Sequence, residues 1–158
     1  MSMNHTRKEL ENQGHFLDDE ALAEIGPWMR WPYVLCSSLM IASIVVASPW
    51  AVWTLSTIAL ATVFLPSHPF NLPYNYVVRH LIGTRPLPPS TKQGKFACGI
   101  AGVWLIATGA AFYVGATTLG YVLGGALSVP AMLVATTQIC IPSYVYNAIF
   151  ENKETQPA

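Results

Sequence analysis

The chain has 158 residues, of which 53% are hydrophobic and only 10% are charged. Soluble domains carry about 25% charged residues, so this composition argues against an ordinary soluble domain and is typical of a membrane protein. The formal net charge is zero, and the basic residues form no dense patch with stacking aromatic residues, which argues against nucleic-acid binding.

Residues 1–26 form a polar segment without the early apolar run of a signal peptide, and we expect this segment to be cytoplasmic. Within it, residues 18–25 predict a short helix, because Asp18 is suited to the N-cap and a glycine-proline pair ends the pattern. A membrane-interface anchor is predicted directly after this helix, formed by Trp28, Arg30 and Trp31.

Two apolar stretches follow, at about residues 31–47 and 50–65, separated only by Ser48-Pro49. One continuous helix of this length would extend roughly 52 Å, well beyond a hydrocarbon core of about 30 Å. Proline also disfavours helix at the residue before it. The sequence therefore predicts a tight helical hairpin, whose outer aromatic belt consists of Trp50 and Trp53.

The central loop, residues 66–95, contains six prolines and no acidic residue. Residues 74–82 lack helix breakers and predict a short amphipathic helix at the inner leaflet, with one apolar face formed by Tyr74, Val77, Val78 and Leu81. Anionic lipid headgroups attract such a loop, and we expect them to bind its basic residues, Arg79, Arg85, Lys92 and Lys95.

A second hairpin is predicted from two further apolar stretches, at about residues 96–114 and 119–141, and a tail of residues 151–158 follows. Pro130 is expected to kink its second helix. Small residues that allow close helix approach recur at Ala107, Ala111, Gly115, Gly120 and Gly124. This face either packs the two helices together or serves as a docking face for another subunit.

The positions of the basic residues predict how the chain is threaded. All of them lie before the first apolar stretch, between the second and third, or after the fourth, at Arg7, Lys8, Arg30, Arg79, Arg85, Lys92, Lys95 and Lys153. Short loops rich in Lys and Arg stay cytoplasmic. We therefore expect an all-α protein of the bacterial inner membrane, with four transmembrane helices in two hairpins and both termini in the cytoplasm.

The apolar stretches lack the side chains on which most membrane cofactors and proton relays depend. None of them contains His, Asp, Glu, Lys or Arg, so neither haem ligation by a mid-membrane histidine nor an ion-coupled relay is expected. No cofactor or metal is predicted. Lipid or pigment can still lie against the apolar faces.

The three cysteines are the one set of side chains with a chemical alternative. Cys36, Cys98 and Cys140 are all predicted at similar depth in the inner leaflet, so they can approach one another if their helices are neighbours. As small apolar residues they would simply fill the core. As a thiol site they would need a positive neighbour, and Lys95 beside Cys98 is the candidate.

The segment Cys140-Ile-Pro-Ser143-Tyr-Val-Tyr146 resembles the C-terminal signature Phe-Cys-x-Gly-Cys-Glu-x-Tyr of a bacterial membrane family, the domain of unknown function 4395. Lys95-Phe96-Ala97 resembles that family's Arg-Phe-Ala. The family is often encoded near thioredoxin-like proteins and sulfurtransferases, which implies sulfur or thiol redox chemistry. Cys140 matches the first motif cysteine, but Ser143 replaces the second, so the motif alone cannot close a disulfide.

Two functions follow as expectations. The first is a non-catalytic accessory or scaffold subunit of a larger respiratory, photosynthetic or sulfur-handling complex, whose partners are other membrane subunits. The alternative is a thiol-active protein of sulfur or redox metabolism, which works through Cys140 with Cys98 or Cys36. A small-solute transporter is a third hypothesis, disfavoured because no charged residue marks a path.

Overall fold

The computed structural model describes residues 3–150, and all regular structure in that range is helical. The all-α class expected from the sequence is confirmed. The predicted tail, residues 151–158 with Lys153, lies outside the described residues.

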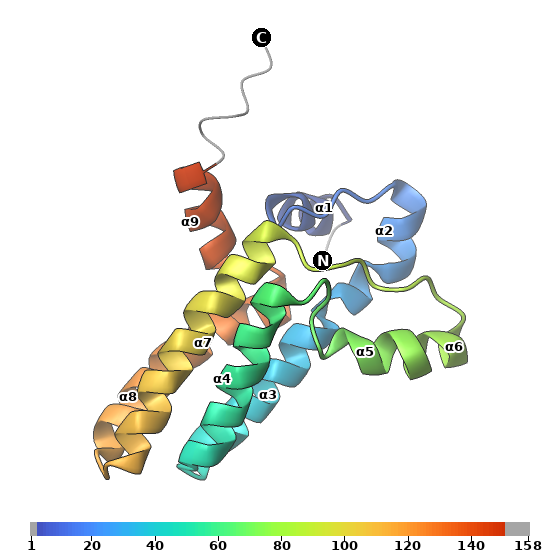
Figure 1. Cartoon of the computed structure of the whole chain (residues 1–158). Helices are drawn as coiled ribbons and strands as arrows, with labels where there is room; N and C mark the ends of the chain where they lie inside the picture. Colours follow the sequence, from blue (N-terminus) through green and yellow to red (C-terminus); the bar gives the residue numbers. More distant parts are fainter. Residues whose placement is uncertain (1–2, 151–158) are drawn as a thin grey trace.

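Four long helices form the body of the molecule (Figure 1), namely α3 (Trp31–Val45), α4 (Pro49–Phe64), α7 (Lys92–Tyr113) and α8 (Thr117–Thr137). The two hairpins α3–α4 and α7–α8 lie side by side. α4 packs most extensively against α7, while α8 contacts both α7 and α3. In the described residues, α7 and α8 are long and apolar enough to cross a membrane, and α4 is a shorter apolar helix.

The two hairpin turns use different local chemistry. Ser48 lies at the N-cap of α4, where its side chain accepts a hydrogen bond from the backbone N–H of Ala51 over 3.3 Å, and Pro49 begins the helix. A proline at the first helical position is favourable because its missing N–H would have no partner there. The second turn contains Gly115 with φ +80°, a conformation that L-residues adopt only with strain.

Close approach of α7 to α4 depends on two glycines. A Cβ at Gly102 would lie 2.6 Å from Cγ of Leu60, and a Cβ at Gly109 would lie 2.4 Å from the indole nitrogen of Trp53. Ser56 donates a 2.7 Å hydrogen bond to the carbonyl oxygen of Gly102. These contacts explain why this pair of helices is the most tightly packed in the bundle.

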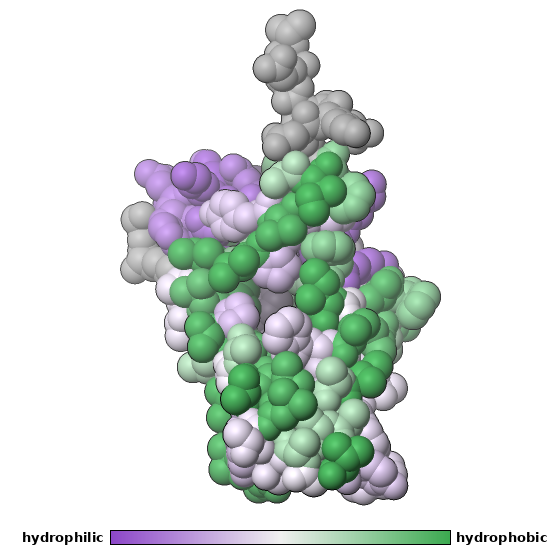
Figure 2. Space-filling view, turned by 90° about the vertical axis from the view of Figure 1, so that its left-hand side faces the viewer, coloured by the Kyte–Doolittle hydropathy of each residue, from purple (hydrophilic) through white to green (hydrophobic). Residues whose placement is uncertain are grey.

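The remaining helices gather at one end of the bundle, where hydrophilic residues also concentrate (Figures 1 and 2). They include α1 (Met3–Asn12), α2 (Asp19–Ile25) and α9 (Ile141–Phe150). The sequence pattern gives no helix before residue 18, yet α1 forms because Leu10 is buried in a cluster with residues of α2 and the following turn. α9 follows a break after α8, where the sequence pattern continues the fourth helix to residue 141.

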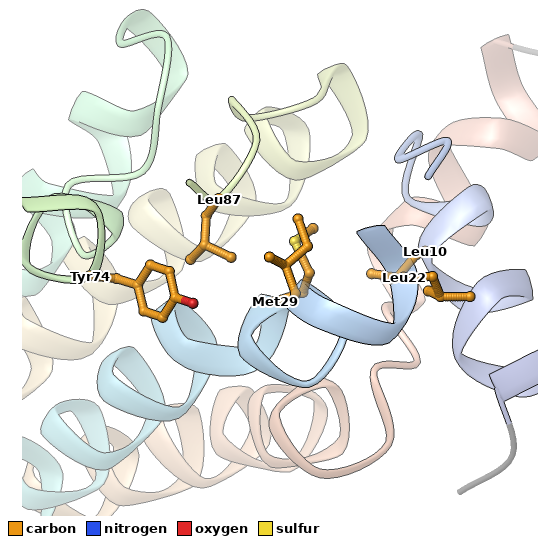
Figure 3. Close-up of a cluster of buried hydrophobic side chains, with 6 residues drawn as sticks. Leu10, Leu22, Met29, Tyr74 and Leu87 are labelled. Atoms are coloured by element: carbon orange, nitrogen blue, oxygen red, sulfur yellow. The ribbon is translucent and has the colours of Figure 1, made fainter. Parts of the chain in front are cut away.

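The central segment adds Tyr74 and Leu87 to this cluster (Figure 3). A continuous helical stretch contains α5 (Asn71–Pro73), a π-helical turn at Tyr74–Val78 and α6 (Arg79–Ile82). Tyr74 is fully buried against Trp28 and Trp31, with ring centroids 5.5 and 6.1 Å away. Val77 and Leu81, expected on the same face as Tyr74, are exposed. The wider π-helical turn rotates them away from the buried tyrosine.

Candidate functional site

One cavity of about 130 Å³ is lined by all three cysteines. Cys36 lies in the second turn of α3, Cys98 lies in the second turn of α7, and Cys140 lies between α8 and α9. The antiparallel hairpins bring the polar ends of α3 and α7 and the end of α8 to the same level of the bundle (Figure 1). Thiols distant in sequence therefore surround one space.

The cavity wall is apolar and built largely from small or flexible side chains. Ala97 and Ala101 of α7 face it, as do Pro130 and Ala131 of α8, and Met40 of α3. Ser37 also lines the cavity, and its hydroxyl donates a 3.2 Å hydrogen bond to the carbonyl oxygen of Ala131. No Asp, Glu, Lys or Arg lines the cavity.

Cys140 lies at the corner between α8 and α9. The preceding Gln138 has φ +62°, which turns the chain out of α8, and Cys140 then precedes the first residue of α9. Ser143 is fully buried, and its backbone N–H acts to lower the pKa of Cys140. Burial is the largest influence and raises the pKa overall. The helix N-terminus partly offsets the desolvation of a thiolate at this position.

His68 and Tyr33 also line the cavity, although no sequence pattern marks them. The Nδ1 atom of His68 accepts a 3.2 Å hydrogen bond from the backbone N–H of Phe70, and the two rings stack. This bond assigns the proton of the neutral ring to Nε2. Burial lowers the pKa of His68 to about 4, so the ring is neutral at physiological pH. Tyr33 lies within electrostatic reach of all three cysteines.

A second, smaller cavity of about 40 Å³ adjoins the first and shares Tyr33, His68 and Cys98 with it. Its other walls come from the polar end of the molecule, including His15, Asn71 and the extended segment at residues 87–91. The side-chain oxygen of Asn71 is buried there without a hydrogen-bond partner. We call these two spaces the thiol cavity and the vestibule.

Metal binding and thiolate activation by a cation find no support in the described residues. Across residues 3–150, no three His, Cys, Asp or Glu side chains lie close enough together to hold one metal ion. Lys95, the expected positive neighbour of Cys98, instead lines an open groove on α7 and is absent from the thiol cavity.

The tryptophans among the expected interface anchors form two aromatic clusters at opposite ends of the bundle. Trp28 and Trp31 pack around Tyr74 at the polar end, and Trp50 and Trp53 pack against Tyr113 at the hairpin turns, with tilted or edge-to-face rings. The basic anchors lie at the polar end. Arg30 donates to the carbonyl oxygen of Thr136 over 3.2 Å, and Arg85 forms ion pairs with α2. The remaining basic anchors are on α6 and on the first turn of α7, at Arg79, Lys92 and Lys95.

The small residues expected on a packing face lie in different environments. Ala111 is buried, Gly120 packs on Phe112 of α7, and Gly124 packs on Ile44 of α3. Ala107 and Gly115 are exposed. The regular four-residue spacing therefore corresponds to no single continuous interface within the described chain.

A family model described as "Domain of unknown function (DUF4395)" matches residues 27–150. The match covers the four-helix bundle, the central segment and α9. No curated protein and no solved structure matches the chain.

Proposed function

The chain belongs to the DUF4395 family, and from that premise we propose a four-span protein of a bacterial inner membrane that performs thiol chemistry in sulfur or redox metabolism. The observation that carries the proposal is the single cavity lined by Cys36, Cys98 and Cys140. Filling a core with small apolar side chains does not require three thiols around one space. Members of the family are often encoded near thioredoxin-like proteins and sulfurtransferases, which supports the same chemistry.

The bundle dimensions support the membrane assignment. α7 and α8 contain 22 and 21 residues, which corresponds to about 32 Å at 1.5 Å per residue and matches a hydrocarbon core of about 30 Å. α3 and α4 are shorter, but α3 continues directly from a helical turn at Pro27–Arg30. Large apolar side chains are exposed around the bundle, among them Val45, Phe64, Val103 and Val129. Lipid tails would cover these side chains.

The distribution of charge supports an orientation with both ends of the chain in the cytoplasm. α1, α9 and the central segment lie at the same end of the bundle (Figure 1), and no charged residue occurs between Phe96 and Phe150. The positive-inside preference favours the cytoplasm for the end that carries Lys and Arg. Tags at residues 1, 90 and 158 should all resist periplasmic proteases, and cleavage at any one of them would refute this topology.

We assign the first step of thiol–disulfide exchange to Cys140, because Ser143 and a helix N-terminus partly offset the rise in pKa that burial causes at this thiol. The Cys140 thiolate attacks one sulfur of an incoming disulfide, which releases one thiol and leaves a mixed disulfide. A second cavity thiol, Cys98 or Cys36, then attacks Cys140 and releases the second thiol. The protein dithiol is oxidised to a disulfide while one external disulfide is reduced to two thiols.

Titration with 2,2′-dithiodipyridine tests this function in the purified protein in lipid nanodiscs. An internal disulfide releases two thiopyridones per cross-link and leaves no mixed adduct, as mass spectrometry can show. Cys140→Ala should abolish the cross-link, and one of Cys36→Ala and Cys98→Ala should abolish it while the other retains it. Thiols that stay inert in the folded protein, or that only form separate mixed adducts, would eliminate thiol exchange as the function.

A separate observation favours a second function, an accessory subunit of a larger membrane complex. An open apolar groove follows α7 between α4 and α8, and its lining includes Phe96, Trp104 and the exposed Ala107. A helix of another subunit fits such a surface in lipid, where small residues permit close packing. Purification from the native membrane in mild detergent decides this point, since a fixed-stoichiometry assembly supports the subunit role and a protein that runs alone opposes it.

A further inference from the structure

The vestibule connects the thiol cavity to the polar end of the molecule. The two spaces share Tyr33, His68 and Cys98, so Cys98 is the thiol that both of them reach. The vestibule walls include His15 and the extended segment at residues 87–91, which lie on the side of α1 and α2. A solute that arrives from this side meets the vestibule before it meets Cys36 or Cys140, which line the thiol cavity alone.

The walls of both spaces carry no formal charge. Neither lining contains Asp, Glu, Lys or Arg. The two histidines are neutral at physiological pH, because burial lowers the pKa of His15 and of His68 to about 4 in each case. An ion that enters loses hydration and gains no counter-charge, which is strongly unfavourable, whereas an uncharged molecule is not penalised in this way.

The vestibule also offers hydrogen-bonding groups that the fold leaves available. Asn71 is 7% exposed, and its side-chain oxygen has no partner in the structure. His68 uses Nδ1 to accept from the backbone, which leaves its Nε2–H as a donor toward other groups. An orphaned buried acceptor is unfavourable unless a guest or water satisfies it. The occupant that fits is therefore small, uncharged and able to donate a hydrogen bond.

We infer that the vestibule is the entrance to the thiol cavity and that it selects small uncharged solutes that donate a hydrogen bond. This inference rests on the proposed thiol function and specifies its substrate class. Small neutral disulfides that carry a hydroxyl or amide donor belong to that class, while charged disulfides and charged peptides do not. Such disulfides should therefore enter in uncharged form and pass Cys98 before they reach Cys140.

Two alkylating reagents of nearly equal size can show whether the vestibule admits uncharged molecules but excludes ions. Iodoacetamide and iodoacetate both form a sulfur–carbon bond with loss of iodide and a proton, but only iodoacetate carries a charge. The full chain in lipid nanodiscs is treated with each, and the rate at Cys98 is followed by mass spectrometry. A Phe16→Cys variant calibrates intrinsic reactivity, because Phe16 is 82% exposed. The amide-to-acetate rate ratio should be more than about tenfold higher at Cys98 than at this control.

Ser90→Trp and Asn71→Leu test the path through the vestibule, and Thr118→Trp serves as the control. Ser90→Trp fills the vestibule wall and should slow iodoacetamide at Cys98, whereas Thr118→Trp at the opposite end of the bundle should leave the rate unchanged. Asn71→Leu should slow iodoacetamide, which donates amide hydrogen bonds, but should spare methyl methanethiosulfonate, which has no donor. Reaction at Cys98 without charge selectivity, or an unchanged rate in Ser90→Trp, overturns the inference and leaves the thiol function standing. Cavity thiols inert to both neutral reagents overturn the function itself.

Discussion

Phe96 and Tyr146 pack with ring centroids 5.4 Å apart and ring planes tilted by 58°, which joins the second turn of α7 to α9. Each belongs to a segment that resembles a family motif, and neither motif alone indicates that they touch. Phe150 extends the cluster, with its ring centroid 4.8 Å from Tyr146. The contact holds α9 on α7, and because Cys140 precedes α9 it also fixes the position of that thiol.

Tyr146→Ala should therefore loosen α9 and destabilise the protein by about 1–3 kcal/mol, from lost aromatic packing and buried area. Thermal unfolding in detergent measures the loss, and the alkylation rate of Cys140 should rise in the folded variant. Tyr146→Phe keeps the ring and serves as the control, with near-normal stability. If Tyr146→Ala and Tyr146→Phe unfold alike, the ring contact does not hold α9.

Gly102 provides a test of the α4–α7 packing. Gly102→Val would force a side chain into Leu60, where a Cβ already falls 2.6 Å from the Cγ atom. Overpacking of this kind costs about 1–3 kcal/mol. Gly125→Val is the matched control, because no atom lies within 4 Å of a Cβ at that helical glycine. A lower thermal midpoint for Gly102→Val alone is the expected result, and equal midpoints would contradict the observed interface.

The four apolar helices were predictable from the sequence because hydropathy and turn residues are local signals. The partner of each helix was not, since small residues recur on several faces. Gly102 and Gly109 make the close approach to α4, while the more regular Ala107 lies exposed. Spacing alone cannot distinguish these glycines from that alanine, because the choice depends on which helix lies opposite.

The candidate site was predictable in part for a similar reason. The topology placed Cys36, Cys98 and Cys140 at one depth, and the structure adds that they line one cavity. His68 reaches that cavity from a proline-rich loop whose path depends on tertiary contacts, such as the 3.1 Å hydrogen bond from the Trp31 indole to the carbonyl oxygen of Phe70. No local pattern encodes such a path.

Gln138 connects the corner between α8 and α9 to the N-terminal segment. Its side-chain amide donates a 3.0 Å hydrogen bond to the carbonyl oxygen of Gly26, although its own φ of +62° is strained. Gln138→Ala loses this buried bond and should be destabilised by about 1–3 kcal/mol. Gln138→Gly loses the same bond but relieves the left-handed strain, so it should be less destabilised than Gln138→Ala by roughly 1 kcal/mol. Chemical unfolding of both variants gives the order, and a more stable alanine variant would contradict it.

Acid should destabilise the protein through His68. Burial lowers its pKa from 6.5 to about 4 in the folded state, so unfolding takes up a proton at any pH between these values. The stabilisation is fully present above pH 6.5 and is lost as the pH falls toward 4. The shift corresponds to about 3 kcal/mol at most, at about 1.4 kcal/mol per pKa unit.

The neighbours of His68 do not reverse the direction of this pH effect on stability. Tyr33 and the cavity cysteines are neutral over that range, and no carboxylate lines either cavity to favour the imidazolium. His15, across the vestibule, has its pKa lowered to about 4 by burial and contributes in the same direction. Thermal midpoints measured from pH 4 to 8 should fall on the acid side for the natural protein. His68→Gln should reduce the decrease of the thermal midpoint at acid pH, and adding His15→Gln should reduce it further. An unchanged acid slope in the double variant would show that neither buried ring controls the acid sensitivity.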